Sequence, residues 1–365
     1  MIRCYNILNV PLRLDAGEAL LASFDLLYGS FVVEQFDVSG EVPFVSVRAV
    51  EEGEFMRIES PWGRVACAHE DAMVLLMFLM QNHFLRSVRD YFAVHAACLD
   101  IVGRGCILTG ASTVGKSTLA VELLRRGWTV FSDEIAAIDR REKRVHAYAR
   151  SLALRPHTLE LVELPADYTV TEMALADELK AVVQPLHRKR DVSGRTTSAS
   201  VVAFLVPPRD AERESVERSV LEVFAPEFTE KFSYALRELD GVIGVESIEG
   251  NFYPGIRILH QPGVLISAAV DEAAARTNTL LAAHHRGARA TIDYDLSPRV
   301  TELAARKGIE MLLGCVVNMR ALMAEEGPAK MMFELSRAFE GARFYEVVPG
   351  RLHETAELVE SLIKQ

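Results

Sequence analysis

The stretch CILTGASTVGKSTLAVELLRR, residues 106–126, predicts the centre of the fold. It contains the pattern Gly-x-x-x-x-Gly-Lys-[Ser/Thr], in which two glycines let successive backbone N–H groups face phosphate oxygens. Lys116 would reach the outer phosphates, and the hydroxyl of Ser117 suits a Mg²⁺ ion. We predict that ATP is bound through its phosphates by Gly110, Ala111, Ser112, Thr113, Val114, Gly115, Lys116, Ser117 and Thr118.

The flanking residues supply the context that this pattern requires. An apolar run at 106–108 predicts a strand, and TLAVELLRR, residues 118–126, has apolar residues at helical spacing. Gly127 stands where a helix commonly ends. The phosphates would therefore lie at the N-terminus of a helix, where the helix dipole favours negative charge.

An acid pair follows the predicted helix. The segment WTVFSDEIAAID, residues 128–139, predicts a short strand that ends near Asp133 and Glu134, with more strand after it. A right-handed crossover would make this strand parallel to the one before the loop, so that both end at the same edge of the sheet. The acids would then lie near the γ-phosphate and its metal ion. A solvated turn is the simpler alternative for two adjacent acids.

Two further polar residues stand in apolar segments. His95 lies in a strand that a turn at 103–105 connects to the loop strand, and a lone histidine there is more often a core residue than a catalytic one. Arg155 precedes Pro156 in SLALRPH, residues 151–157. A buried guanidinium needs a partner, and a phosphate or a structural salt bridge would serve.

Composition excludes some classes of function. The net charge of −11 argues against a general binder of nucleic acids or anionic membranes. The apolar run Ala72–Met80 is too short to span a bilayer, and the first residues do not resemble a secretory signal. The five cysteines are scattered, which is typical of reduced thiols in a cytoplasmic protein.

The pattern along the chain predicts four regions. Residues 1–90 form a β-rich region with a buried helix that begins near residue 70, and residues 91–211 form a phosphate-loop kinase core. Residues 212–325 form an extra α+β module, compatible with a ferredoxin-like unit, that recognises a substrate or a partner in a homo-oligomer. Residues 326–365 add a helix, a strand and a final helix to the core. Within the core, the basic run Arg140–Arg144 predicts a solvated hairpin tip.

The order of these motifs resembles the HPr kinase/phosphorylase-like serine kinases. The resemblance covers about 91–165: the histidine strand, the glycine-rich loop and its helix, VFSDEIAAI, and LALRPHTLEL. It implies an α/β kinase core whose nucleotide site is similar to that of the ATP-using phosphoenolpyruvate carboxykinases. It also implies that Asp133 is the general base toward a serine hydroxyl. His95 and Arg155 match a histidine and an arginine of these kinases.

The chain departs from that family at two points. Glu134 stands where the family usually has a second aspartate, and the phosphorylase signature Glu-x-Arg-Gly-x-Gly does not occur. The resemblance therefore does not extend to the reverse, phosphate-dependent reaction or to HPr itself as the substrate.

Together these features predict an ATP-dependent kinase that phosphorylates a serine of a peptide or protein. Lys116, Asp133, His95 and Arg155 are its candidate catalytic residues, and Ser117, Asp133 and Glu134 are the candidate ligands of Mg²⁺. A kinase of a small hydroxylated metabolite and a nucleotide-sensing protein without catalytic activity are the alternatives that the sequence leaves open.

Overall fold

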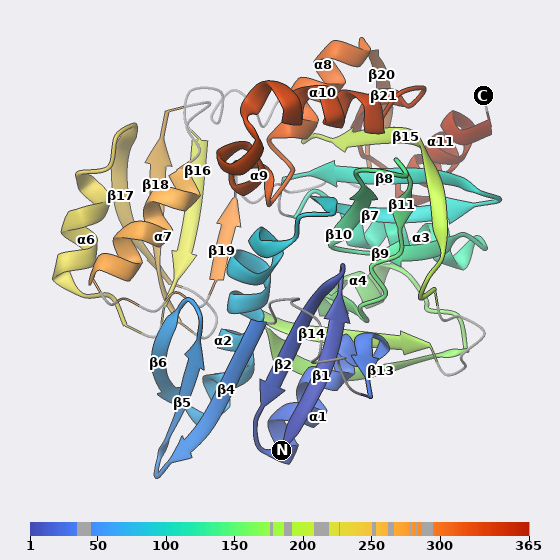
Figure 1. Ribbon diagram of the computed structural model, residues 1–365. Helices are drawn as coiled ribbons and strands as arrows, with labels where there is room; N and C mark the ends of the chain where they lie inside the picture. Colours follow the sequence, from blue (N-terminus) through green and yellow to red (C-terminus); the bar gives the residue numbers. More distant parts are fainter. Residues whose placement is uncertain are drawn as a thin grey trace.

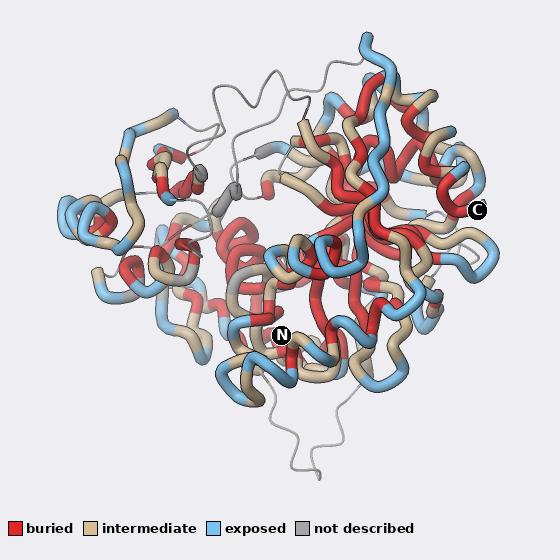
Figure 2. Tube along the Cα trace, turned by 90° about the horizontal axis from the view of Figure 1, so that it is seen from above, coloured by how far each residue is buried: buried red, intermediate tan, exposed pale blue. Residues whose placement is uncertain are grey.

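The structure is a computed structural model that describes residues 1–34, 45–111, 113–175, 178–185, 192–207, 219–225, 227–249, 253–261, 266–277, 279, 281, 283–286 and 295–364. Figure 1 shows an N-terminal sheet, a central α/β core, and a smaller α+β unit to one side. Buried residues gather in the interior of the molecule, and exposed residues lie on its outer segments (Figure 2). No helix of the described residues is long and apolar enough to cross a membrane.

The N-terminal region is a six-stranded sheet with the order β3-β1-β2-β4-β5-β6. Its strands are β1 (Ile2–Ile7), β2 (Val10–Asp15), β3 (Val32–Val33), β4 (Val45–Glu52), β5 (Phe55–Ser60) and β6 (Gly63–Ala68). The sequence predicted mostly strands here, but helix α1 (Glu18–Tyr28) interrupts them. Leu20, Leu21, Phe24 and Leu27 of α1 are buried at helical spacing, so packing against the sheet stabilises this helix.

The predicted helix that begins near residue 70 is shorter than its apolar pattern indicated. Helix α2 (Ala72–Leu79) passes into a π-helical turn at Met80–Phe84 and a 3-10 turn at Leu85–Ser87. The chain then straightens and enters strand β7 at Tyr91. All eight residues of α2 are buried, which confirms a buried helix in this region.

A fully buried asparagine fixes the point at which the helix gives way to the strand. The side-chain amide of Asn318 donates to the carbonyl oxygens of Val88 (2.9 Å) and Tyr91 (2.8 Å) and its oxygen accepts from the backbone N–H of Ala93 (3.0 Å). These bonds require extended backbone around Val88. A residue far along the chain therefore overrides the local helical pattern.

The core is built on an eight-stranded sheet. Its order is β11-β10-β7-β8-β15-β21-β20, with β9 also paired to β7 and β11 also paired to β15. The strands are β7 (Tyr91–Ile101), β8 (Arg104–Gly110), β9 (Thr129–Ser132), β10 (Ile135–Asp139), β11 (Val145–His146), β15 (Thr196–Leu205), β20 (Arg299–Leu303) and β21 (Arg343–Val348). Strands β7 and β8 form an antiparallel hairpin, as predicted, and β15 runs parallel to both β8 and β21.

Helices cover the two faces of this sheet. Helices α3 (Lys116–Arg125) and α11 (Leu352–Lys364) pack on one face through a core that includes Leu119, Trp128 and Val359. The other face carries α8 (Ala305–Leu313), α9 (Met319–Glu326) and α10 (Pro328–Ala338). Helix α4 (Pro156–Leu161) and the three-stranded sheet of β12 (Leu152–Leu154), β14 (Glu178–Pro185) and β13 (Tyr168–Leu175) lie below the core in Figure 1.

The smaller unit has the strand order β17-β18-β16-β19, with every pair antiparallel. Its elements in chain order are β16 (Ser219–Phe224), α6 (Glu230–Arg237), β17 (Val242–Glu249), β18 (Pro254–His260), α7 (Ile266–Thr277) and β19 (Ala283–Arg286). This is the βαββαβ order of a ferredoxin-like unit. Its two helices share a core with the sheet that includes Leu221, Phe232 and Val270.

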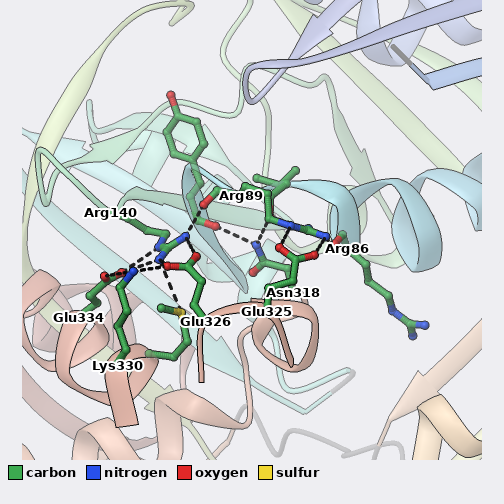
Figure 3. Close-up of polar contacts among 11 residues, drawn as sticks. Arg86, Arg89, Arg140, Asn318, Glu325, Glu326, Lys330 and Glu334 are labelled. Carbon is green, nitrogen blue, oxygen red and sulfur yellow. Dashed lines mark hydrogen bonds and ion pairs between the residues drawn. The ribbon is translucent and has the colours of Figure 1, made fainter. Parts of the chain in front are cut away.

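An ion-pair network joins helices α9 and α10 to the core (Figure 3). The guanidinium of Arg140 lies 2.8 Å from Glu326 and 2.6 Å from Glu334, and Lys330 pairs with both acids. Arg140 is only 11 % exposed, so the prediction of a solvated basic tip was wrong for its first residue. Arg140 is buried because it pairs with Glu326 and Glu334, which lie nearly 200 residues away in the chain. The local charge pattern does not reveal these partners.

Candidate functional site

The loop between β8 and α3 has a backbone that requires glycine. Gly110 has a φ of +147°, and a Cβ there would lie 2.2 Å from the carbonyl oxygen of Leu205. Gly115, immediately before α3, has a φ of +82°. Between them, the side chain of Val114 is fully buried in the core beneath α3. The loop is therefore fixed to the sheet by two glycines and one apolar side chain.

The remaining loop residues differ in their surroundings. Thr113 adopts a left-handed backbone with a φ of +66°, and Ser112 lies outside the described residues. Ser117 is half-buried in the first turn of α3. The hydroxyl of Thr118 lies 3.2 Å from that of Thr158, which ties α3 to α4. Thr118 thus contributes to the packing of the two helices.

Lys116 is the buried cation of the loop. Its side chain folds back so that Nζ donates to the carbonyl oxygens of Gly110 (2.9 Å) and Ala111 (2.8 Å). Burial lowers the pKa of Lys116 to about 8, the nearby charge of Arg155 acts in the same direction, and Cys315 opposes it. These influences place Arg155 and Cys315 within electrostatic reach of the lysine.

The acid pair lies at a break within a strand. Strands β9 and β10 both pair antiparallel with β7, and Asp133 and Glu134 separate them. The sequence predicted a short strand that ends near these acids with more strand after it, and β9 and β10 confirm this. The backbone stays beside β7 between them, where Ala96 N–H donates to Glu134 O (2.9 Å). Strand β9 is parallel to β8, as predicted, with β7 between them.

This arrangement fixes the distance between the acids and the loop. On one side of β7, Ala96 pairs with Thr109, the residue before the loop, and on the other side it bonds to Glu134. One intervening strand therefore separates the start of the loop from the acid pair. Two strand spacings correspond to roughly 10 Å between their backbones.

The two acids have different partners. Asp133 is 8 % exposed, and its Oδ2 accepts from the backbone N–H of Ala153 at 2.9 Å. Its Oδ1 is buried and has no hydrogen-bond partner among the described residues. Glu134 accepts from Gln81 Nε2 through Oε1 and forms an ion pair with Arg150 through Oε2. Asp133 is therefore the acid with an oxygen available to a ligand.

Sequence reasoning did not find Gln81 or Arg150. Gln81 follows α2 in the π-helical turn, 53 residues before Glu134. Arg150 lies in HAYARSL, residues 146–152, and its side chain is 4 % exposed. One signal was present, because an arginine in a segment with few other charges requires a partner when it is buried. Its spacing from the loop motif, however, indicated no particular partner.

His95 lies where the loop leaves the sheet. Its side chain is exposed on a strand whose neighbouring residues are buried, so it is not a core histidine. Its carbonyl oxygen accepts from the Thr109 hydroxyl (2.9 Å), and its N–H donates to Cys315 O (2.8 Å). The segment around Val316 takes the place of β8 beside β7 beyond this point. The structure thus brings His95 beside the start of the loop.

Arg155 occupies the position before the first turn of α4 rather than a place within a strand. Strand β12 ends immediately before it, and β12 also carries the N–H of Ala153 that binds Asp133. The Thr118–Thr158 contact brings α4 against the start of α3. The short segment from Ala153 to Arg155 therefore connects the acid pair to the loop.

Few side chains at the candidate site could coordinate a metal ion. Within the parts of the chain that are described, no three His, Cys, Asp or Glu side chains gather as a metal site. The feature that fits a cation or a hydroxyl group is the buried Oδ1 of Asp133, because buried carboxylate oxygens normally have a partner. A metal at this point would have to complete its shell with phosphate oxygens and water.

Comparison with known proteins finds a similarity to one family over the part of the chain that carries this site. Residues 87–183 match the HPr serine kinase C-terminal domain. This part of the chain is therefore similar to HPr kinases. The matched residues contain the glycine-rich loop, the acid pair, Arg150 and Arg155, whereas the ferredoxin-like unit lies outside them.

Individual relatives agree over short stretches. The chain is 41 % identical over 83 residues to an HPr kinase/phosphorylase of Halalkalibacterium halodurans, which covers 22 % of this chain and 26 % of that protein. It is 35 % identical over 71 residues to a putative HPr kinase/phosphorylase 2 of Oceanobacillus iheyensis, covering 20 % and 23 %. The HPr kinase-like similarity thus spans about a quarter of the length of these relatives.

Proposed function

We propose that the protein is an ATP-dependent kinase that transfers the γ-phosphoryl group to a serine hydroxyl of a peptide or protein. The main support is the buried Oδ1 of Asp133, which has no partner in the described structure and lies one strand away from the loop that carries Lys116. The resemblance to kinases named for a protein substrate supports a protein or peptide acceptor over a small metabolite.

In this proposal the glycine-rich loop between β8 and α3 binds ATP, the phosphoryl donor. The backbone N–H groups of residues 111–117 would face the phosphates, and Lys116 would exchange its two carbonyl partners for phosphate oxygens. Arg155, within electrostatic reach of Lys116, would neutralise charge on the transferred group. Mg²⁺ would be held by Ser117 with an acid of the pair, and it supplies further neutralisation of phosphate charge.

The transfer itself requires positioning of the acceptor. A bond forms between the serine Oγ and the γ-phosphorus while the bond from that phosphorus to the β–γ bridging oxygen breaks, and ADP leaves. Asp133 Oδ1 would accept the hydrogen bond of the serine hydroxyl and then its proton. His95, exposed beside the loop, would contact the acceptor or the transferred group.

The decisive experiment combines a loop variant with an acceptor search. Purified protein is incubated with γ-labelled ATP and a lysate fractionated by size. Label should appear on serine in peptide or protein fractions, and Lys116→Ala should abolish this transfer while the protein stays folded. Lys307→Ala, on the exposed face of α8, is the matched control and should transfer normally. Label confined to small molecules, or normal transfer by Lys116→Ala, would contradict the proposal.

A further inference from the structure

We infer that Glu134 is a positioning residue rather than a magnesium ligand, and that Arg150 and Gln81 hold it in that role. This inference rests on the proposed function and decides which member of the acid pair is available to the metal and the acceptor. It follows from the partners of each polar atom in the segment from Ser132 to Ile135.

The backbone of this segment is held from both sides. The hydroxyl of Ser132 accepts from the N–H groups of Glu134 (3.0 Å) and Ile135 (2.9 Å). The carbonyl oxygen of Glu134 accepts from Ala96 N–H on β7. These bonds form the break between β9 and β10 and set the direction in which each acid leaves the backbone.

One oxygen of the Glu134 carboxylate accepts a hydrogen bond, and the other has no hydrogen bond but lies in an ion pair. Gln81 Nε2 donates to Oε1, and the guanidinium of Arg150 pairs with Oε2. The carboxylate is 14 % exposed and the arginine 4 %, so both charges are largely removed from water. A metal could bind Glu134 only if it displaced these partners, and the buried Arg150 would then lose its counter-charge.

Arg150 is itself held in place. Its guanidinium carbon lies 5.8 Å from the centre of the Tyr28 ring on α1, and Tyr148 beside it is fully buried. Arg150 Nε has no hydrogen-bond partner among the described residues, so Glu134 carries most of its compensation. The pair therefore links the acid segment to the N-terminal region, while Gln81 links it to α2.

Asp133 shows the opposite pattern. Ala153 N–H holds its Oδ2, which fixes the orientation of the carboxylate, and its Oδ1 is left for a ligand. A glutamate at position 134 reaches farther than an aspartate by one methylene group, which lets it reach Gln81 and Arg150 while the shorter Asp133 stays beside β12. The ion pair between Glu134 and Arg150 thereby holds the backbone of the strand break, and this backbone positions the adjacent Asp133.

The test separates metal binding from phosphoryl transfer. Magnesium-dependent ATP binding is measured by equilibrium titration for the wild-type protein, Ser117→Ala and Glu134→Gln. The loss of a ligand in Ser117→Ala should raise the magnesium concentration for half-maximal binding about fivefold or more. Glu134→Gln should leave it within about twofold of the wild type. A shift in Glu134→Gln as large as in Ser117→Ala would overturn the inference and identify Glu134 as a ligand.

Transfer rates then test positioning. Rates are normalised to the fraction of protein that binds ATP. On this basis, Arg150→Met and Glu134→Gln should each lower kcat about tenfold or more with little change in the KM for ATP. The double variant Arg150→Met/Glu134→Gln removes both charges and should recover most of kcat. Unchanged kcat in both single variants would reduce the pair to a stabilising contact and overturn the inference. Failure of the wild-type protein to bind MgATP would instead refute the proposed function itself.

Discussion

Two clusters of arginine and carboxylate lie at the two ends of β10 and differ in how completely their atoms are paired. In the cluster of Figure 3, Arg140 contacts Glu326 and Glu334, and Lys330 adds a second cation. In the candidate site, Arg150 compensates Glu134, but Asp133 keeps one buried oxygen without a partner in the described structure.

Under the proposed function, this difference separates a structural network from a binding site. The hydrogen bond from Arg140, supported by that from Lys330, lowers the pKa of Glu326 to about 2, as expected for an acid that stays ionised in a permanent pair. A buried carboxylate oxygen without a partner is unfavourable unless a ligand completes it. The first cluster fixes α9 and α10 to the core, and under the proposed function the open oxygen of the second binds a ligand.

The largest expected effect tests the unpartnered acid. Asp133→Asn should lower phosphoryl transfer about 10³-fold, because the side chain can no longer accept the hydroxyl proton. Transfer is measured as initial rates with saturating MgATP. Asp100→Asn is the matched control on the same sheet, since both oxygens of Asp100 already have partners, Thr197 and Gly103.

The control separates the two kinds of acid. Asp100→Asn should lower thermal stability and leave kcat nearly unchanged. Asp133→Asn should lower kcat and leave thermal stability nearly unchanged. Transfer by Asp133→Asn within a few-fold of the wild-type rate would remove this residue from the site.

A smaller effect, on stability, is expected when the ion-pair network around Arg140 is broken. Arg140→Met should lower the free energy of unfolding by about 2–3 kcal/mol, less than for fully buried pairs because Glu326 and Glu334 remain about a quarter exposed. Urea titrations measure this difference. Arg351→Met breaks an exposed pair with Glu354 and should cause no detectable change.

Transfer activity of folded Arg140→Met should equal that of the wild-type protein. If Arg140→Met abolished activity while it stayed folded, the distinction between a structural network and a binding site would fail.

The smallest effect concerns the pH dependence of the charges of Lys116 and Lys330. Because the folded pKa of Lys116 is lowered to about 8, the empty loop loses its cation as the pH rises through 8, and ATP affinity should fall about tenfold between pH 7 and 9. The hydrogen bond to Glu326 instead raises the pKa of Lys330, which stays charged over this range. Equilibrium titrations with ATP at both pH values measure the difference.

Lys116→Arg keeps a permanent charge and should give affinities that do not vary between pH 7 and 9. A flat profile for the wild-type protein would show that burial does not control the charge of Lys116.

The sequence predicted the parts of the site that local chemistry dictates. The glycine-rich loop, the helix after it and the hairpin before it follow from residues that are close in the chain. Helix α1 was missed although Leu20, Phe24 and Leu27 have helical spacing, because the surrounding segments alternate like strands. The roles predicted for His95, Arg155 and Asp133 stay predictions, and the experiments above test that of Asp133.

Tertiary contacts decided what the sequence could not. Asn318 ends the helical segment near Val88, more than 200 residues away in the chain, and Glu326 and Glu334 bury Arg140. The break at Asp133 and Glu134 depends on pairing with β7, whose register no local pattern specifies.

The sequence by itself determined the glycine-rich loop, because a backbone with positive φ at Gly110 and Gly115 requires glycine at fixed spacing. It also determined that two acids follow the loop helix. Only the tertiary structure separated those acids, because partners from distant segments reach Glu134 and leave Asp133 Oδ1 open. Hydrogen bonds and ion pairs between distant residues depend on packing, and local propensity does not encode them.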